Sequence, residues 1–168
     1  MNKAAIIRLL TDKYTSFINT INGLTEAEYQ FSDQDKWTAG QQLQHLVLCV
    51  KPLVQVFSMG ASAIAQNFGV SDRPGLTYEA LLISYLEKLN QGGKAPDRYV
   101  PPAASQGEMV VLTDTLSQLI ESLCGKIENF SEASLDSLYI PHPLLGKLTL
   151  REMLYNTIYH AEHHEKQV

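Results

Sequence analysis

Hydrophobic residues recur at intervals of three and four along most of the chain, which is the spacing of amphipathic helices. Polar stretches rich in Gly, Pro and Ser separate these periodic segments. The pattern predicts helical segments over residues 2–22, 38–68, 77–91 and 113–129, and a last helix that begins at Thr149. Pro52 lies inside the second segment, and we expect it to kink that helix because proline removes a backbone donor.

Three helix starts carry a capping box, in which Ser or Thr is followed three residues later by Glu or Gln. The three pairs are Thr25 with Glu28, Thr38 with Gln41, and Thr149 with Glu152. The first pair introduces only a short helical turn. The other two mark the starts of the second and the last long helix.

The connections between the helices are long. Residues 94–107 hold three prolines and no hydrophobic period, and residues 131–146 are predicted to be mostly loop, with an extended segment at Pro141-His142-Pro143. The only weak strand candidate is residues 110–112. The predicted fold class is therefore all-α, a four-helix bundle that forms a single domain over residues 1–168. Connections of this length argue against a simple up-down-up-down order.

Composition narrows the class of protein. The 168 residues are 45% hydrophobic and 18% charged, which is ordinary for one globular domain. The net charge of −5, without a cluster of Lys and Arg, argues against nucleic acid as a partner. No apolar run approaches the ~20 residues of a membrane span. Cys49 and Cys124 both lie in apolar helical segments and are predicted to be buried free thiols, so we expect a cytoplasmic protein.

Three of the five histidines lie in the last helix. On a wheel of about 100° per residue, His164 falls on the apolar face, His160 at its edge and His163 on the solvent side. His160 and His164 are therefore neighbours at i and i+4 and could chelate a transition metal. Spacing alone leaves open that they are ordinary core or exposed histidines. A zincin protease is not predicted, because Ala161 follows His160 where the HExxH pattern needs Glu.

A catalytic metal usually keeps three protein ligands, so a third is needed. His45 is the natural candidate in the second helix, on a flank with Gln42 and Cys49, but an ordinary polar residue is an equal alternative on the pattern. His142 is either a loop histidine or part of a pocket mouth. No general base is evident. The two glutamates of the last helix, Glu162 and Glu165, face away from the inferred site. Tyr78, Tyr85 and Gln42 are guesses at residues that line the pocket.

Three motifs carry a resemblance to a known family. Residues 37–46, WTAGQQLQHL, resemble the opening of the second helix in the DinB superfamily, also called YfiT-like, with its pattern W-S/T-x-x-E/Q-x-x-x-H-L. Residues 142–152 resemble the loop before the last helix of that family. His160-x-x-x-His164-x-x-Gln167 is similar to its closing motif. The motifs occur in the family's order and together span the chain from Trp37 to its end.

The resemblance implies a four-helix bundle with up-down-down-up topology, often a homodimer. It also implies a divalent metal, commonly zinc or nickel, held by three histidines that correspond to His45, His160 and His164. Members of the family include metal-dependent hydrolases and transferases that use low-molecular-weight thiols. One expectation is therefore a metal-dependent enzyme, hydrolase or thiol transferase, that acts on a small molecule. The other is a bundle that binds metal or serves a stress response without catalysis.

Overall fold

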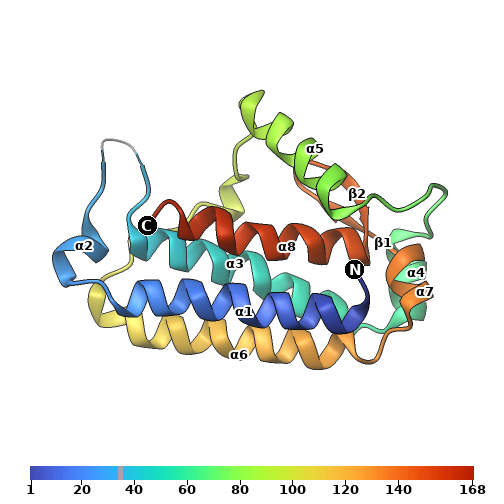
Figure 1. Cartoon of the computed structure of the whole chain (residues 1–168), viewed down its shortest axis with the longest axis horizontal. Coiled ribbons are helices and arrows are strands. Elements are labelled where there is room, and N and C mark those ends of the chain that lie inside the picture. Colours follow the sequence, from blue (N-terminus) through green and yellow to red (C-terminus); the bar gives the residue numbers. More distant parts are fainter. Residues whose placement is uncertain (34–35) are drawn as a thin grey trace.

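The computed structural model describes residues 1–33 and 36–168. Four long helices lie alongside one another as a bundle (Figure 1): α1 (Lys3–Asn22), α3 (Ala39–Ser58), α6 (Met109–Ile127) and α8 (Leu150–Glu165). α1 and α8 run in one direction along the bundle, and α3 and α6 run in the other. The all-α fold class and the up-down-down-up topology are therefore confirmed.

The core lies between these four helices. α3 packs on α6, and α1 packs on both α6 and α8. α1 shows how the pattern produces this packing, since every buried residue on it lies three or four positions from the next: Ile6, Leu10, Tyr14, Phe17 and Ile21. Each such side chain contributes roughly 1.5–3 kcal/mol when it is fully removed from water.

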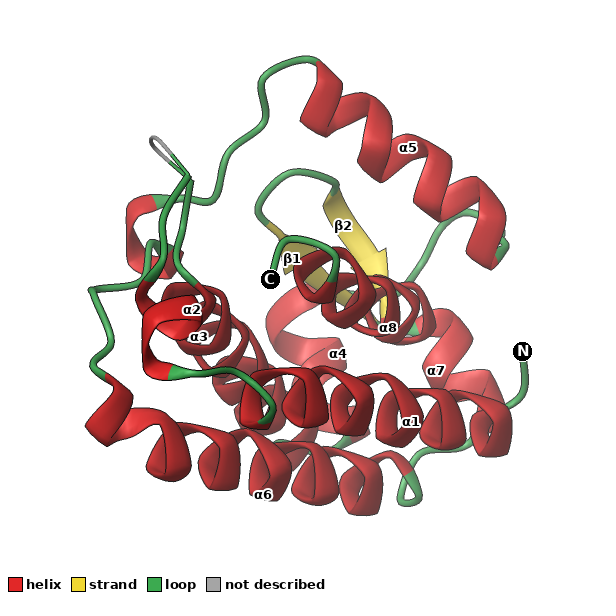
Figure 2. Ribbon diagram, turned by 60° about the vertical axis from the view of Figure 1, so that its left-hand side comes forward, coloured by secondary structure: helices red, strands yellow, loops and turns green. Residues whose placement is uncertain are grey.

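Shorter elements surround the bundle. They are α2 (Glu26–Gln30), α4 (Ala61–Phe68), α5 (Tyr78–Asn90), α7 (Glu132–Ser137) and the 3₁₀ helices η1 (Asp97–Tyr99) and η2 (Gln106–Glu108). Figure 2 shows that α5 stands outside the bundle, where it packs against α8. All three predicted capping boxes are present, at the starts of α2, α3 and α8.

The predicted continuous helix over residues 38–68 is wrong. α3 ends at Ser58, and α4 begins at Ala61 after a bend of 110°. Gly60 lies at the break, with φ of +78°. This positive φ is unfavourable for residues that have a Cβ atom, so glycine allows the chain to bend here. Pro52 lies inside α3, which continues beyond it.

Two strands occur where a loop was predicted. β1 (Tyr139–His142) pairs antiparallel with β2 (Gly146–Thr149), with Tyr139 opposite Thr149 and His142 opposite Gly146. The tentative strand at residues 110–112 is instead part of α6, which begins four residues before its predicted start at residue 113. The hairpin leads directly into α8 and so places His142 beside the middle of that helix.

None of the helices in the described ranges is by itself long and apolar enough to cross a membrane. α3 and α4 meet the length and composition test only when they are taken together across their bend.

Candidate metal centre

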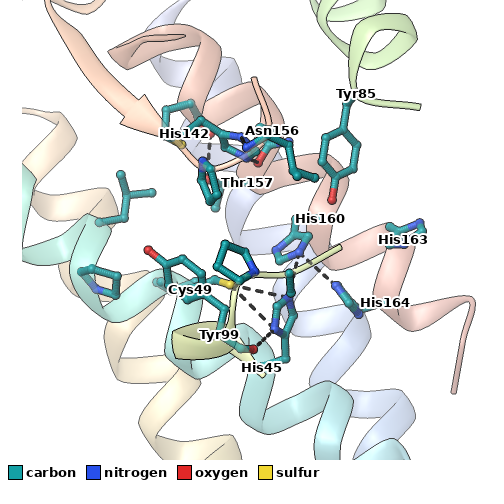
Figure 3. A pocket seen from close by; sticks show the side chains of 18 of the residues that line it. His45, Cys49, Tyr85, Tyr99, His142, Asn156, Thr157, His160, His163 and His164 are labelled. Carbon is teal, nitrogen blue, oxygen red and sulfur yellow. Dashed lines mark hydrogen bonds between the residues drawn. The ribbon is translucent and has the colours of Figure 1, made fainter. Parts of the chain in front are cut away.

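The structure brings together the three histidines that the sequence singled out. His45 comes from α3, and His160 and His164 come from α8 (Figure 3). The Nε2 atom of His160 lies 3.2 Å from Nε2 of His45 and 2.9 Å from Nε2 of His164. Nitrogens bound to one tetrahedral zinc at 2.0–2.1 Å are about 3.3 Å apart. The ligand nitrogens of all three rings lie within 4.8 Å of one another, so they could hold one metal ion, and their role as ligands stays a prediction.

Two of these rings are held by hydrogen bonds on the side away from the site. Nδ1 of His45 donates to the carbonyl oxygen of Tyr99 at 2.7 Å, and Nδ1 of His164 donates to Oε1 of Gln42. Gln42 is itself fixed by Gln167, whose Oε1 accepts from Gln42 Nε2 at 3.3 Å. Because Nδ1 carries the proton in both rings, each Nε2 presents a lone pair to the site, as a metal ligand must.

Burial keeps the three imidazoles neutral. Desolvation lowers the pKa of His160 and His164 well below the ordinary value, and the neighbouring imidazoles lower it further. Burial also lowers the pKa of His45, although the bond to the Tyr99 carbonyl opposes this. Neutral imidazole is the form that binds a metal, so the site does not need to lose protons to accept one near neutral pH.

Helical spacing explains why these side chains share one cavity. Gln42, His45 and Cys49 follow each other at intervals of three and four on α3 and all line it. The flank of the second helix that carries His45 therefore faces the bundle interior. On α8, His160 and His164 lie one turn apart on the same wall.

The cavity beside the histidines has a volume of about 720 Å³, within the usual range of small-molecule sites. Beyond the two helices, side chains from α5, η1 and the hairpin complete its wall, among them Tyr85, Tyr99 and His142. Trp37 stands at the histidine end, with its ring nearly parallel to that of His164 at a centroid distance of 6.3 Å. A small molecule in this space would lie directly against the three imidazoles.

The two histidines outside the triad, His163 and His142, both line the cavity. His163 was predicted to face solvent, but it is half-buried at the cavity rim, between the rings of Tyr159 and His164. The wheel missed this because Tyr159 and the end of the chain cover that flank. His142 is a strand residue that lines the cavity, which confirms the pocket alternative over the loop one.

Of the residues suggested as pocket lining two do line the cavity, and the two glutamates of α8 do not. Tyr85 and Gln42 line the cavity, whereas Tyr78 packs on Tyr155 elsewhere. The two glutamates of α8 point away, as predicted: Glu162 pairs with Lys13 and Lys166, and Glu165 accepts from Ser16 and Thr20.

Both cysteines are free and partly buried. Cys124 lies near Thr11, far from the site. Cys49, by contrast, lines the cavity with Sγ 3.5 Å from Nε2 of His45, and burial raises its pKa to about 12. The sequence placed Cys49 on the same flank as His45 but predicted only a buried free thiol, so its contact with the cavity is a new finding.

Comparison with known protein families assigns the chain to a family. A family model described as the DinB superfamily matches residues 9–168. The chain belongs to the DinB superfamily. This match extends the resemblance noted from Trp37 onward back into α1. No curated protein sequence matches the chain. Within this DinB superfamily protein, the motif histidine of α3 and the motif histidine pair of α8 meet at one end of the bundle.

Proposed function

We propose that this DinB superfamily protein is a divalent-metal-dependent enzyme that acts on a small molecule in the cavity. The convergence of three neutral Nε2 atoms, two from buried rings and one from a half-buried ring, on one point of the cavity wall is the observation that carries the proposal. Three protein ligands leave a coordination position for substrate or water, which is the arrangement of catalytic rather than structural zinc sites. Zinc or nickel suits imidazole donors.

His45, His160 and His164 would hold the metal. When bound, it would polarise a substrate or lower the pKa of a coordinated water or thiol. The Tyr99 carbonyl and Gln42 keep two of the rings in the ligating tautomer. Hydrolysis and thiol-dependent transfer onto an electrophile are both served by such a site.

Other residues would bind and orient the substrate. Burial raises the pKa of Tyr85 to about 12, so its hydroxyl stays protonated and can donate a hydrogen bond. The Cys49 thiol is likewise neutral and contributes a small, weakly polar surface next to His45.

A second candidate is a bundle that binds metal without turnover. The wall of the cavity favours it in one respect, because no Asp or Glu occurs among its described lining residues to serve as a general base. Catalysis would then depend on the metal, on groups that the substrate brings and on the two wall histidines outside the triad, His142 and His163.

Metal content tests the first part of the proposal. Untagged protein is dialysed against zinc or nickel and then against buffer, and metal per chain is measured by mass spectrometry. We expect about one equivalent in the wild type and in His163→Ala, and a loss of most of it in His164→Ala. His163 is the matched control because it adjoins His164 without offering a nitrogen to the triad. A wild type without stoichiometric metal, or a His164→Ala variant that retains it, would refute metal binding.

Activity tests the second part. Metal-loaded protein is incubated with a nitrophenyl ester, and separately with a chloronitroarene and small thiols. We expect one of these reactions to exceed the protein-free rate and to stop when a chelator is added. Turnover that survives chelation would contradict the mechanism, and bound metal without turnover would favour the non-catalytic bundle.

A further inference from the structure

One buried polar atom on the cavity wall lacks a partner. Asn156 of α8 is 8% exposed, and its Nδ2 atom is fully buried with no hydrogen-bond partner among the described residues. An unsatisfied buried donor costs free energy, so native proteins seldom keep one without a reason. Because Asn156 lines the cavity, a ligand there could satisfy this donor.

His142 fixes which end of the Asn156 amide is free. The backbone N–H groups of Leu144 and Leu145 donate to Nδ1 of His142, at 3.2 and 3.1 Å. Nδ1 is therefore an acceptor, and the proton of the neutral ring lies on Nε2, which donates to Oδ1 of Asn156 at 3.2 Å. Rotating the amide by 180° would set an N–H group against this N–H group. Nδ2 is thus held as a hydrogen-bond donor.

The charges of the wall indicate the kind of acceptor. Among the described lining residues, the formally charged ones are Lys36, Lys94 and Arg98, and none is acidic. This is opposite in sign to the chain's net charge of −5. Lys36 also pairs with Asp33, so Lys94 and Arg98 are the main source of the local field. Exposed cations around a pocket attract anions and raise their local concentration.

Helical spacing relates the donor to the candidate metal centre. Asn156, His160 and His164 are at i, i+4 and i+8 on α8 and form one row along the cavity wall. At 1.5 Å per residue, Asn156 lies about 6 Å from His160 along the helix axis. In Figure 3, His160 lies between Asn156 and His45. A short molecule can therefore touch the amide with one end and the three histidines with the other.

We propose that Asn156 is a specificity-determining residue whose Nδ2 binds the carboxylate of an anionic small molecule, while the reacting end of that molecule lies at the three histidines. The second half of this statement rests on the proposed function. A carboxylate fits better than a neutral carbonyl because of the basic mouth. It fits better than a phosphate because the amide stands beside a neutral His142 rather than in a cluster of donors.

Thiol probes of graded length test the joint placement. The protein is loaded with cobalt(II), and thiolate binding is followed by its charge-transfer absorption. Linear mercaptocarboxylates from mercaptoacetate to 6-mercaptohexanoate are compared with alkanethiols of equal length. A charge-assisted hydrogen bond contributes about 1.5–3 kcal/mol, so the best mercaptocarboxylate should bind at least about tenfold more tightly than its alkanethiol.

The matched variant is Asn156→Asp. It keeps the oxygen that accepts from His142 and the shape of the side chain, but it replaces the NH₂ donor by an oxygen and adds a negative charge when the carboxyl group ionises. We expect cobalt and alkanethiols to bind as in the wild type and the preference for the carboxylate to disappear. Asn129→Asp, the same change at an exposed position just beyond the C-terminal end of α6 and outside the cavity lining, should leave the preference intact.

A second measurement separates this inference from the proposed function. In ¹⁵N-labelled, metal-free protein, the side-chain NH₂ signal of Asn156 is identified by its absence from the Asn156→Asp spectrum. It should shift on addition of butyrate or hexanoate and not of the corresponding alcohols. If the wild type takes up no cobalt, the proposed metal site fails, and the amide shift still decides the role of Asn156. If cobalt and thiols bind but neither a carboxylate preference nor an amide shift occurs, the role of Asn156 is overturned and the metal site stands. An amide shift without a thiol preference would overturn the joint placement.

Discussion

The carboxylate of Glu152 joins the start of α8 to the loop that leads into α5, and its replacement by glutamine tests how much this link stabilises the fold. Glu152 is 1% exposed. It accepts hydrogen bonds from both terminal nitrogens of Arg73, at 2.6 and 2.7 Å, and from the backbone N–H groups of Leu76 and Thr149, at 2.7 and 2.8 Å. Every acceptor position on this carboxylate therefore faces a donor.

Glutamine preserves the shape but turns one oxygen into a donor that faces other donors. About half of the contacts are lost, and charge-assisted bonds contribute roughly 1.5–3 kcal/mol each. Removing one partner of a buried pair costs about 3–5 kcal/mol. The Arg73 side chain is 35% exposed and regains water, so the lower end applies. We expect Glu152→Gln to lower the free energy of unfolding by about 3 kcal/mol at pH 7, or the melting temperature by roughly 6–12 °C.

Urea unfolding followed by circular dichroism measures this loss. Glu162→Gln is the matched control on the same helix, because Glu162 makes only partly exposed ion pairs with Lys13 and Lys166. Such pairs contribute less than about 1 kcal/mol. The reasoning is refuted if Glu152→Gln destabilises the protein no more than Glu162→Gln does.

The pH dependence of the difference between wild type and Glu152→Gln provides a second test. Burial opposes ionisation of Glu152, but the bonds from Arg73, Leu76 and Thr149 outweigh it and hold its pKa below the ordinary value. The stabilisation is therefore present above the pKa of the unfolded state, about 4.3, and is lost as the pH falls through the lower folded value. The difference between wild type and Glu152→Gln should narrow below about pH 4. A difference that stays constant in acid would contradict this account.

Two further predictions concern stability. Burial lowers the pKa of His142 from 6.5 to about 4, so the unfolded state binds more protons than the folded state between these pH values. The free energy of unfolding therefore falls as the pH is lowered through this window. Urea unfolding at several pH values should show a shallower fall in His142→Gln than in the wild type, and equal slopes would contradict this role of His142. In Gly40→Ala, the new Cβ would lie 2.8 Å from Cε1 of Tyr29 and 3.0 Å from the carbonyl oxygen of Ala104, which should destabilise the protein by about 1–3 kcal/mol. Gly125→Ala on α6 meets nothing within 4 Å and should instead stabilise it by about 0.5–1 kcal/mol, so equal effects in thermal melts would refute the packing argument.

The bundle was predictable because its information is local. Each long helix has a hydrophobic stripe with a helical period, and the capping boxes mark three starts within a few residues. The break at Gly60 was not predictable in this way, because α4 buries Ile64 in the same core and so continues the apolar pattern. The hairpin was missed because its strands of four residues are too short for alternation to be recognised, and its stability depends on contacts with α8.

The candidate site was likewise predictable where the sequence information is local, and not where it depends on tertiary contacts. The pair His160 and His164 follows from helical spacing, and His45 from its flank together with the family resemblance. The Tyr99 carbonyl and the free amide of Asn156 could not be found, because their roles exist only once η1 and the hairpin close around α3 and α8. A polar residue at i−4 from His160 was visible in the sequence, but nothing local shows that its amide nitrogen would lack a partner.

The position of the site explains why buried polar side chains meet there. α3 packs chiefly on α6, and α8 chiefly on α1, so the two helices that carry the histidines meet along a shorter seam. His45 lies near the start of α3 and His164 near the end of α8, which the antiparallel order brings to the same end of the bundle. In this seam, three neutral imidazoles face one another, and Nδ2 of Asn156 has no acceptor among the described residues. A buried donor without a partner costs free energy. A metal at the imidazoles and an acceptor at the amide would satisfy these groups together, and one ligand-bound arrangement accounts for both.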